Sequence, residues 1–299
     1  MLDFVQNCLD GLMIGSSYSL LAIGFTLIFG VMRRLNLSYG PSIMFGVFFG
    51  TLIYLEFEAG NFVVAFATVI GALVAGIYVE RVCFWAVRQG AALASMVSTF
   101  AVWMQLEEVV TLVFPERTYP FPALTEADPI EFGPFFFKVE NLIMLVCAVA
   151  MMIALHFLLY KTRFGLALRA VSENPLAARF MGVNIAAISF SAFLAASAFG
   201  GVSGYLIVAA DAQITPMFGL WATFKGLIAM MLGGMGSIPG AILGGLLLGV
   251  IESNCLWYVG PEFRDLAAFT ILFAFLAFRP GGIMGQVAVL REEAAARRV

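Results

Sequence analysis

Long apolar runs separated by short polar segments make up most of the chain. The runs fall at about 11–31, 40–55, 61–80, 93–114, 141–160, 186–208, 217–234, 238–258 and 265–279. Most of them hold the ~20 predominantly apolar residues that an α-helix needs to cross a bilayer. A membrane β-barrel would show alternating segments of about ten residues instead. The pattern predicts an all-α polytopic membrane protein with about nine membrane-crossing segments, forming one transmembrane domain over residues 1–299.

The composition points to the same class. The chain of 299 residues is 62% hydrophobic and 12% charged, whereas a soluble domain has about 25% charged residues. Its four cysteines lie far apart without a C-x-x-C pair, and it has one histidine. We therefore expect the cysteines to be small apolar fillers and expect no metal site. The sequence also lacks the G-x-x-x-x-G-K-[ST] loop, so this chain should not bind ATP itself.

The positions of lysine and arginine predict the orientation of the helices. If the N-terminus lies outside and all runs cross, the cytoplasmic segments contain twelve of the 16 basic residues and the outer segments contain three. The twelve are Arg33, Arg34, Arg81, Arg88, Lys161, Arg163, Arg169, Arg179, Arg279, Arg291, Arg297 and Arg298. Basic residues concentrate in the cytoplasmic loops of membrane proteins. We therefore expect the N-terminus outside, the C-terminus inside, and segment 161–185 in the cytoplasm.

The longest outer segment, residues 115–140, contains five of the eleven prolines together with five acidic residues. This composition is typical of an ordered but irregular extracytoplasmic loop. The loop serves either as a docking face for a soluble partner or as a plain connection, and its residues favour neither.

Two of the apolar runs are interrupted by helix breakers. Residues 35–50 are broken by a Gly-Pro pair at Gly40, and residues 212–227 by Pro216 and Gly219. The two segments follow spans in the two halves of the chain and run in opposite directions in the predicted topology. Interrupted segments in corresponding places are typical of transporters built from inverted repeats. Free backbone groups at membrane depth must be buried in protein or line a cavity, so we expect polar solutes to be handled near these breaks.

The most polar segment of the chain, residues 163–184, is called the polar segment below. Its sequence, RFGLALRAVSENPLAARFMGVN, predicts a short helix, a break at Asn174–Pro175, a second short helix and an end at Gly182. Charges at the centre of a membrane helix cost about 2.5–3.5 kcal/mol each, so the segment should lie in water. Two amphipathic helices at an angle suit either a groove on a soluble partner or the lipid headgroup surface. The residues alone leave both open.

Four stretches, in the correct order, resemble ABC-importer permeases of the branched-chain amino acid (LivH/LivM-like) family. They are the polar segment, GSSYSLLA at 15–22, KGLIAMMLGGMGSIPGAILGGLLLGVIE at 225–252 and RPGGIMG at 279–285. The first span starts almost at the N-terminus, which is most similar to the shorter, H-type subunit. One stretch departs, because the family usually has Asn-Phe-Ala-His-Gly where this chain has Asn-Leu-Ser-Tyr-Gly at 36–40. If that stretch lines the solute path, the substrate preference would differ from that of leucine-type permeases.

The resemblance implies the type II ABC-importer fold and a transporter permease rather than an enzyme. It implies a second permease subunit, identical or paralogous, that completes the pathway through the bacterial inner membrane. Two cytoplasmic ATPases would bind ATP and Mg, and an extracytoplasmic binding protein would deliver branched-chain or related small amino acids. No cofactor in this chain and no nucleic-acid partner are expected.

The same resemblance makes the polar segment the loop that couples the permease to its ATPases. The residues onto which this role is carried are Arg169, Ala170, Glu173, Asn174, Ala178 and Gly182.

Candidates for the solute path share a polar side chain within or beside an apolar run. They are Ser17, Asn36, Ser38, Tyr39, Gln105 and Lys225. Asn36, Ser38 and Tyr39 lie beside a break, where they either line the path or cap and pack a helix.

Ionisable residues inside membrane spans are candidate functional sites by default. Gln105 lies with Glu107 and Glu108 near the outer end of its run, where a carboxylate also reaches headgroup water. Lys225 lies nearest the middle of a run and either receives a solute carboxylate or balances a carboxylate such as Glu252. We favour the pairing with Glu252.

A stand-alone secondary transporter, or a channel for a small polar solute such as urea or an amide, is the alternative function. Such a carrier needs midplane carboxylates for ion coupling, which this sequence largely lacks, and it has no need of the polar segment. A membrane-embedded hydrolase or transferase is disfavoured, because the runs show no cluster of His, Asp and Glu and no serine beside a base.

Overall fold

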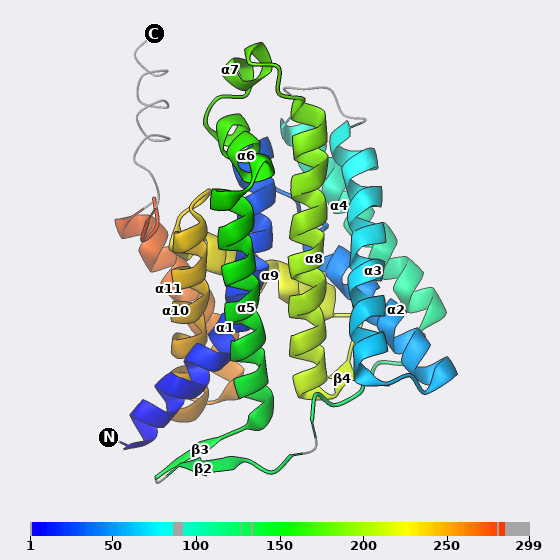
Figure 1. The fold of residues 1–299 in the computed structure, drawn as a ribbon. Coiled ribbons are helices and arrows are strands. Elements are labelled where there is room, and N and C mark those ends of the chain that lie inside the picture. Colours follow the sequence, from blue (N-terminus) through cyan, green and yellow to red (C-terminus); the bar gives the residue numbers. More distant parts are fainter. Residues whose placement is uncertain (1, 86–91, 126, 133, 280, 285–299) are drawn as a thin grey trace.

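The computed structural model describes residues 2–85, 92–125, 127–132, 134–279 and 281–284. The C-terminus lies outside these ranges. So do four of the basic residues on which the predicted orientation rests, namely Arg88, Arg291, Arg297 and Arg298. The long helices form one bundle that carries the N-terminus at one end and two short helices at the other (Figure 1).

In the described part of the chain, a helix occupies each of the nine apolar runs. The nine are α1 (Leu2–Met32), α2 (Tyr39–Phe57), α3 (Asn61–Val79), α4 (Ala92–Val113), α5 (Val139–Lys161), α8 (Ile185–Asp211), α9 (Phe218–Gly233), α10 (Ile238–Tyr258) and α11 (Arg264–Phe278). The smaller elements are a π-helical turn (Glu80–Trp85), α6 (Arg163–Glu173), α7 (Pro175–Phe180), a 3-10 turn (Pro261–Phe263) and the strands β1 (Tyr119–Pro120), β2 (Ile130–Phe132), β3 (Phe135–Phe137) and β4 (Gln213–Ile214).

The expected count of nine crossing segments is supported only roughly. Among the described residues, seven helices are long and apolar enough to cross a membrane, whereas α9 and α11 have 16 and 15 residues. At 1.5 Å per residue α9 is about 24 Å long, which is less than the ~30 Å of a bilayer core. Pro216 accounts for the late start of α9, because the chain after α8 first forms β4 and a turn. Gly219, also predicted to break this run, lies within α9.

The two halves of the bundle use equivalent helices in equivalent contacts. Helix α1 packs along α10 and α8 packs along α3, while α2 contacts α3 and α9 contacts α10. The broken-run helices α2 and α9 also pack against each other. Because α1 and α8 run in opposite directions (Figure 1), this exchange of contacts is the arrangement that an inverted repeat predicts.

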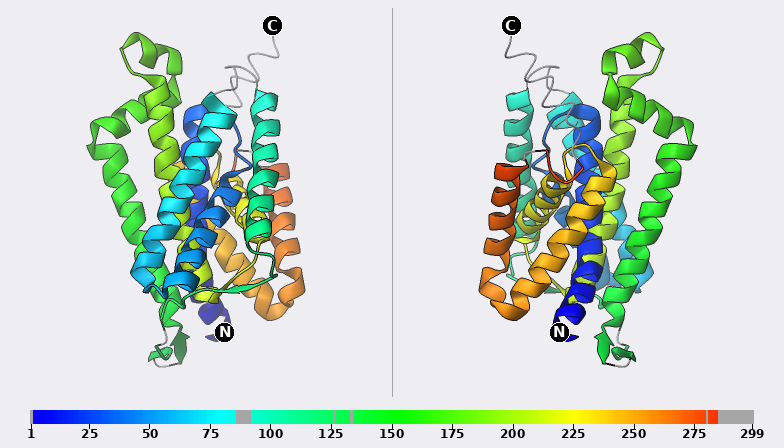
Figure 2. Two further views of the ribbon diagram at one scale, coloured as in Figure 1. Left: turned by 90° about the vertical axis from the view of Figure 1, so that its right-hand side faces the viewer. Right: turned by 90° about the vertical axis from the view of Figure 1, so that its left-hand side faces the viewer.

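Helix α1 occupies the centre of the bundle. In the most apolar 18-residue stretch of α1, 83% of the residues are buried. The corresponding share is 22% in α4 and in α5, which lie at the periphery (Figure 2). Its closest neighbour is α10, and glycines allow the two backbones to touch. A Cβ atom added to Gly11 would lie 2.6 Å from Val250 Cα, and one added to Gly249 would lie 2.5 Å from Gly15 N. Real Cβ atoms do not approach backbone atoms this closely, so the α1–α10 contact requires glycine at these positions.

The outer segment 115–140 is more regular than its prolines suggest. Strands β2 and β3 form a hairpin, and the Gln6 side chain of α1 holds it through Phe136, donating to its carbonyl at 2.6 Å and accepting from its N–H at 3.2 Å. Strand β1 pairs with β4, with Tyr119 opposite Ile214. Extended backbone has free hydrogen-bonding groups along its edges, and pairing with β4 and Gln6 satisfies several of them here.

Candidate functional site

The polar segment folds as its sequence predicts, as two short helices at the end of the bundle opposite the N-terminus (Figure 1). Helix α6 begins at Thr162, whose hydroxyl accepts from Gly165 N at 3.1 Å. Asn174 caps α7 by accepting from Ala177 N at 3.0 Å, and Pro175 suits the first turn because it needs no N–H partner. Gly182 ends the segment with φ +82, a conformation that favours glycine. The predicted break at Asn174 and end at Gly182 are confirmed.

Four apolar side chains of the polar segment stand out from the bundle: Leu166, Leu176, Phe180 and Met181. Phe180 is 82% exposed and Met181 is 84% exposed. Apolar side chains that extend from a polar segment beyond the spans mark a surface for a protein partner or a membrane. These two residues, which sequence reasoning assigned only to the second helix, form its most exposed tip.

The six residues predicted for coupling divide into an anchored group and an exposed group. The Arg169 guanidinium lies over the Tyr160 ring, 4.8 Å from its centroid, and Ala178 is buried. Ala170 is half-buried, whereas Glu173 is exposed. Asn174 and Gly182 are exposed as well and shape the backbone. Direct contact with a partner is therefore available to Glu173 and the α7 tip, while Arg169 and Ala178 hold the helices in place.

The path candidates beside the first predicted break, Asn36, Ser38 and Tyr39, form hydrogen bonds to backbone groups of this chain. The side-chain Oδ1 of Asn36 accepts from Ser38 N at 3.1 Å, and the Ser38 hydroxyl donates to the backbone carbonyl of Thr99. The Tyr39 hydroxyl donates to the Ala196 carbonyl at 2.8 Å. All three polar side chains are buried. These bonds correspond to the packing role that the sequence left open, and the path role stays a prediction.

Ser17 and Gln105 have hydrogen-bond partners outside this group. Ser17 is fully buried, and its hydroxyl donates to the Ile14 carbonyl at 2.7 Å. Gln105 is exposed on α4, where its amide oxygen accepts from the Tyr78 hydroxyl at 2.7 Å. Their path role stays a prediction as well.

Lys225 belongs to a buried charge network that joins four helices. Its Nζ donates to Glu252 Oε1 of α10 at 2.5 Å and to Asp265 Oδ1 of α11 at 2.7 Å. Arg264 Nε donates to Glu252 Oε2 at 2.8 Å, and Arg264 Nη2 donates to the Tyr18 hydroxyl of α1 at 2.6 Å. The Tyr18 hydroxyl in turn donates to Glu252 Oε2 at 3.0 Å. The favoured pairing of Lys225 with Glu252 is confirmed.

Burial differs sharply across this network. The side chains of Lys225 and Glu252 are 3% and 2% exposed, whereas that of Asp265 is 63% exposed. A buried charge is tolerated only with partners that satisfy it, and Glu252 has three. Sequence reasoning missed Arg264 and Asp265, although an adjacent pair of opposite charges at the start of an apolar run was a visible signal.

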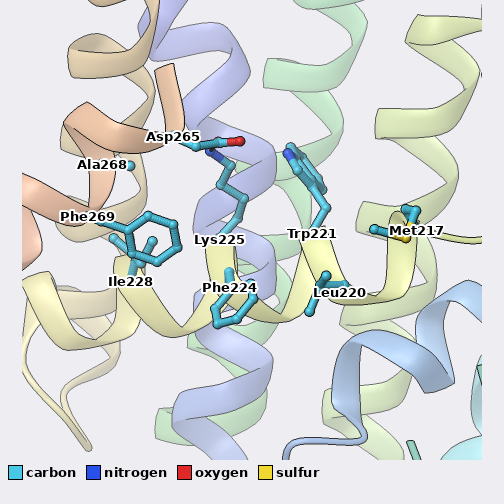
Figure 3. A pocket seen from close by; sticks show the side chains of 9 residues that line it. All are labelled: Met217, Leu220, Trp221, Phe224, Lys225, Ile228, Asp265, Ala268 and Phe269. Atoms are coloured by element: carbon cyan, nitrogen blue, oxygen red, sulfur yellow. Dashed lines mark hydrogen bonds and ion pairs between the residues drawn. The ribbon is translucent and has the colours of Figure 1, made fainter. Parts of the chain in front are cut away.

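A cavity of about 250 Å³ opens beside Lys225 and Asp265, between α9 and α11. The remaining residues around it are apolar or aromatic: Met217, Leu220, Trp221, Phe224, Ile228, Ala268 and Phe269. In Figure 3, Lys225 reaches Asp265 at one side of the cavity, and the nitrogen of Trp221 is turned toward the same side. The cavity is therefore polar at one end and apolar elsewhere.

Comparison with known proteins extends the resemblance over the whole chain. Residues 7–276 match the family described as branched-chain amino acid transport system / permease component. The high-affinity branched-chain amino acid transport system permease protein LivH of Escherichia coli K12 is 30% identical over 298 residues, covering 95% of this chain and 96% of LivH. The permease protein BraD of Pseudomonas aeruginosa is 30% identical over 296 residues, with the same coverage of 95% and 96%.

Solved structures confirm the fold. A metal-chelate type ABC transporter in an inward-facing conformation aligns with a TM-score of 0.54 at 15% identity, covering 92% of this chain and 85% of that chain. The fold is thus that of an ABC transporter permease, and the apolar helices make the protein a multi-pass membrane protein. With the family matched over most of its length, this chain belongs to the permease components of branched-chain amino acid transport systems.

Proposed function

We propose that this ABC-importer permease subunit takes up branched-chain or related small amino acids across the bacterial inner membrane. The similarity to LivH and BraD, both permeases of branched-chain amino acid transport systems, supports that substrate class. ATP hydrolysis, with its Mg, would take place in two cytoplasmic ATPase subunits and not in this chain. A second permease subunit, identical or paralogous, and an extracytoplasmic solute-binding protein complete the proposed complex, the latter docking near segment 115–140.

The exposed tip of the polar segment is the observation that carries the coupling role. Phe180 and Met181 present apolar surface where the lipid spans have ended, and a groove on a soluble ATPase would cover it. Helix α6 packs against α1, α5 and α8, and Arg33 Nη2 donates to the Ser172 carbonyl at 3.4 Å. A push on the tip is therefore transmitted to three long helices, which is what coupling of ATP hydrolysis to transport requires.

Replacing Phe180 and Met181 together by serine is expected to lower ATP-driven leucine uptake by at least about tenfold, because exposed aromatic and methionine anchors contribute roughly 2 kcal/mol or more to an interface. Uptake is measured in proteoliposomes that contain the complete complex and the solute-binding protein. ATPase subunits should co-purify less well with this variant than with the wild type.

Phe278→Ser is the matched control, because Phe278 is 89% exposed at the end of α11, away from the polar segment. It should leave both uptake and co-purification unchanged. Unchanged uptake in the double variant would refute the coupling role. A wild-type chain that transports without any ATPase would favour a stand-alone carrier instead.

The proposed orientation predicts which residues a membrane-impermeant thiol reagent can reach. In a variant with its four native cysteines replaced, Ala177→Cys in α7 should react only after the membrane is permeabilised. Asp128→Cys in the outer segment should react in intact cells, since both positions are exposed. Labelling with the two sides reversed would overturn the orientation and the coupling role together.

A further inference from the structure

The cavity between α9 and α11 has the features of a site for a small zwitterion. We propose that it binds a neutral aliphatic α-amino acid, with the carboxylate on Lys225 and Trp221 and the ammonium on Asp265. This inference rests on the proposed function and adds to it a solute-binding site within this chain.

Hydrogen-bonding capacity is left over at the polar end of the cavity. An ammonium has three donors, and Lys225 uses two of them on Glu252 and Asp265. Asp265 accepts from Lys225 through Oδ1 only, so Oδ2 has no partner among the described residues. The indole N–H of Trp221 likewise has no acceptor there, and the Lys225 ammonium lies 5.7 Å from the Trp221 ring centroid. Three residues that line the cavity therefore have two donors and one acceptor unused, which matches the carboxylate and the ammonium of one amino acid.

The charges of the network favour a ligand without net charge. Lys225 and Arg264 are balanced by Glu252 and Asp265, so the four residues sum to zero. A zwitterion adds one charge of each sign and keeps this balance. A cationic or anionic amino acid would add a charge that the balanced network leaves unpaired, and beside the buried Lys225 and Glu252 such a charge is costly. The network therefore selects for a neutral amino acid.

The apolar end of the cavity favours an aliphatic side chain. Leu220, Phe224, Ile228 and Phe269 offer carbon surface only, and burying a leucine or valine side chain contributes about 1.5–3 kcal/mol. The volume of about 250 Å³ is below the ~300–1,000 Å³ typical of pockets for drug-sized ligands. The cavity thus suits a ligand of amino-acid size.

Asp265 is also open to a partner. Its side chain is 63% exposed in the first turn of α11, so a ligand or another protein can reach it. A solute ammonium satisfies it directly. The competing explanation is that a second permease subunit packs over α9 and α11 and covers Asp265. Only a solute site makes the effect of an Asp265 variant depend on whether the ligand has an ammonium.

The test is equilibrium binding of radiolabelled leucine to the complete complex in lipid nanodiscs, without the solute-binding protein. The competitor is 4-methylpentanoate, which has the carbon skeleton and carboxylate of leucine but no ammonium. In the wild type, 4-methylpentanoate should compete at least about tenfold more weakly than leucine, because it lacks a charge-assisted hydrogen bond to Asp265.

Asp265→Asn is expected to weaken leucine binding by about tenfold or more. The variant should also prefer leucine over 4-methylpentanoate less strongly than the wild type does, or should prefer 4-methylpentanoate. Without the Asp265 charge the network carries one uncompensated cation, which favours a ligand with a carboxylate and no ammonium. A purely structural role would weaken both ligands alike. Glu262→Gln is the matched control, since it makes the same change of carboxylate to amide at an exposed residue nearby, and it should change neither affinity.

Leu220→Phe provides a second test that keeps every charge in place. It reduces the free volume of the cavity, so leucine binding should weaken more than alanine binding, whereas a general loss of folding would affect both equally.

Failure of the proposed amino-acid site and failure of the proposed transport function give different results. If the wild-type complex with its binding protein takes up leucine while both variants bind and transport it normally, the site is wrong and the proposed function stands. If Asp265→Asn lowers only the yield of paired permease subunits, α9 and α11 form a subunit contact and the site is also wrong. If the wild-type complex takes up no leucine or related amino acid, the proposed function fails.

Discussion

Glu252→Gln is expected to destabilise the folded protein by about 3–5 kcal/mol, the usual effect of breaking a buried ion pair from one side. Glu252 accepts from Lys225, Arg264 and Tyr18, and glutamine would leave the two cations with one exposed carboxylate between them. The loss should appear as unfolding at lower denaturant when the purified chain is titrated with SDS and followed by circular dichroism.

Glu108→Gln on α4 is the matched control, because Glu108 is exposed and has no hydrogen bond among the described residues. It should change stability by no more than about 0.5 kcal/mol. Adding Lys225→Met to Glu252→Gln should recover part of the loss, since it removes one of the stranded cations. Equal stability of Glu252→Gln and the wild type would mean that the network contributes nothing to the fold.

Gly249→Leu is expected to cost at least about 3 kcal/mol, at the upper end of the cost of overpacking. The clash falls on the α1 backbone, because a Cβ atom at this position lies 2.5 Å from Gly15 N. A flexible side chain could rotate away from an added methyl group, but a helix backbone must move as a whole. The same SDS titration measures the loss, and the variant should also express poorly in the membrane.

Gly60→Leu is the control for this change, since nothing lies within 4 Å of a Cβ atom at Gly60 and its φ of −65 suits any residue. It should leave stability nearly unchanged. Should Gly249→Leu unfold at the wild-type SDS concentration, the close α1–α10 contact would be wrong.

Much of the fold is predictable from the sequence because the bilayer imposes a simple requirement on each span. A run of about twenty apolar residues can only be a helix there, so eight of the nine ranges agree with their helices to within three residues, whereas α1 begins nine residues before its range. Pro216 precedes the short α9, but the predicted break at Gly40 is wrong, because Gly40 lies in the first turn of α2, which is long enough to cross. Polar capping residues are equally local signals: Asn174 caps α7 at the predicted break, and Thr162 caps α6 in the same way.

The sites were harder to predict because polar residues within spans meet partners far along the chain. Asp265 contacts Lys225 across 40 residues and Arg264 contacts Tyr18 across 246, and no local pattern encodes either meeting. Ser17, Asn36 and Tyr39 looked like path residues because they are polar in apolar runs. Hydrogen bonds to backbone groups satisfy such side chains just as well, and sequence does not distinguish the two roles.

The pairing of β1 with β4 has a consequence for how the outside of the protein communicates with its interior. Tyr119 lies opposite Ile214, and Phe121 N and Leu124 N donate to the carbonyls of Ala212 and Ala209, each at 3.0 Å. Helix α9, which carries Lys225, begins four residues after Ile214. The outer segment is thus hydrogen-bonded to the chain just before α9, so that a protein docked on this segment would contact the connection to the helix that bears the buried lysine.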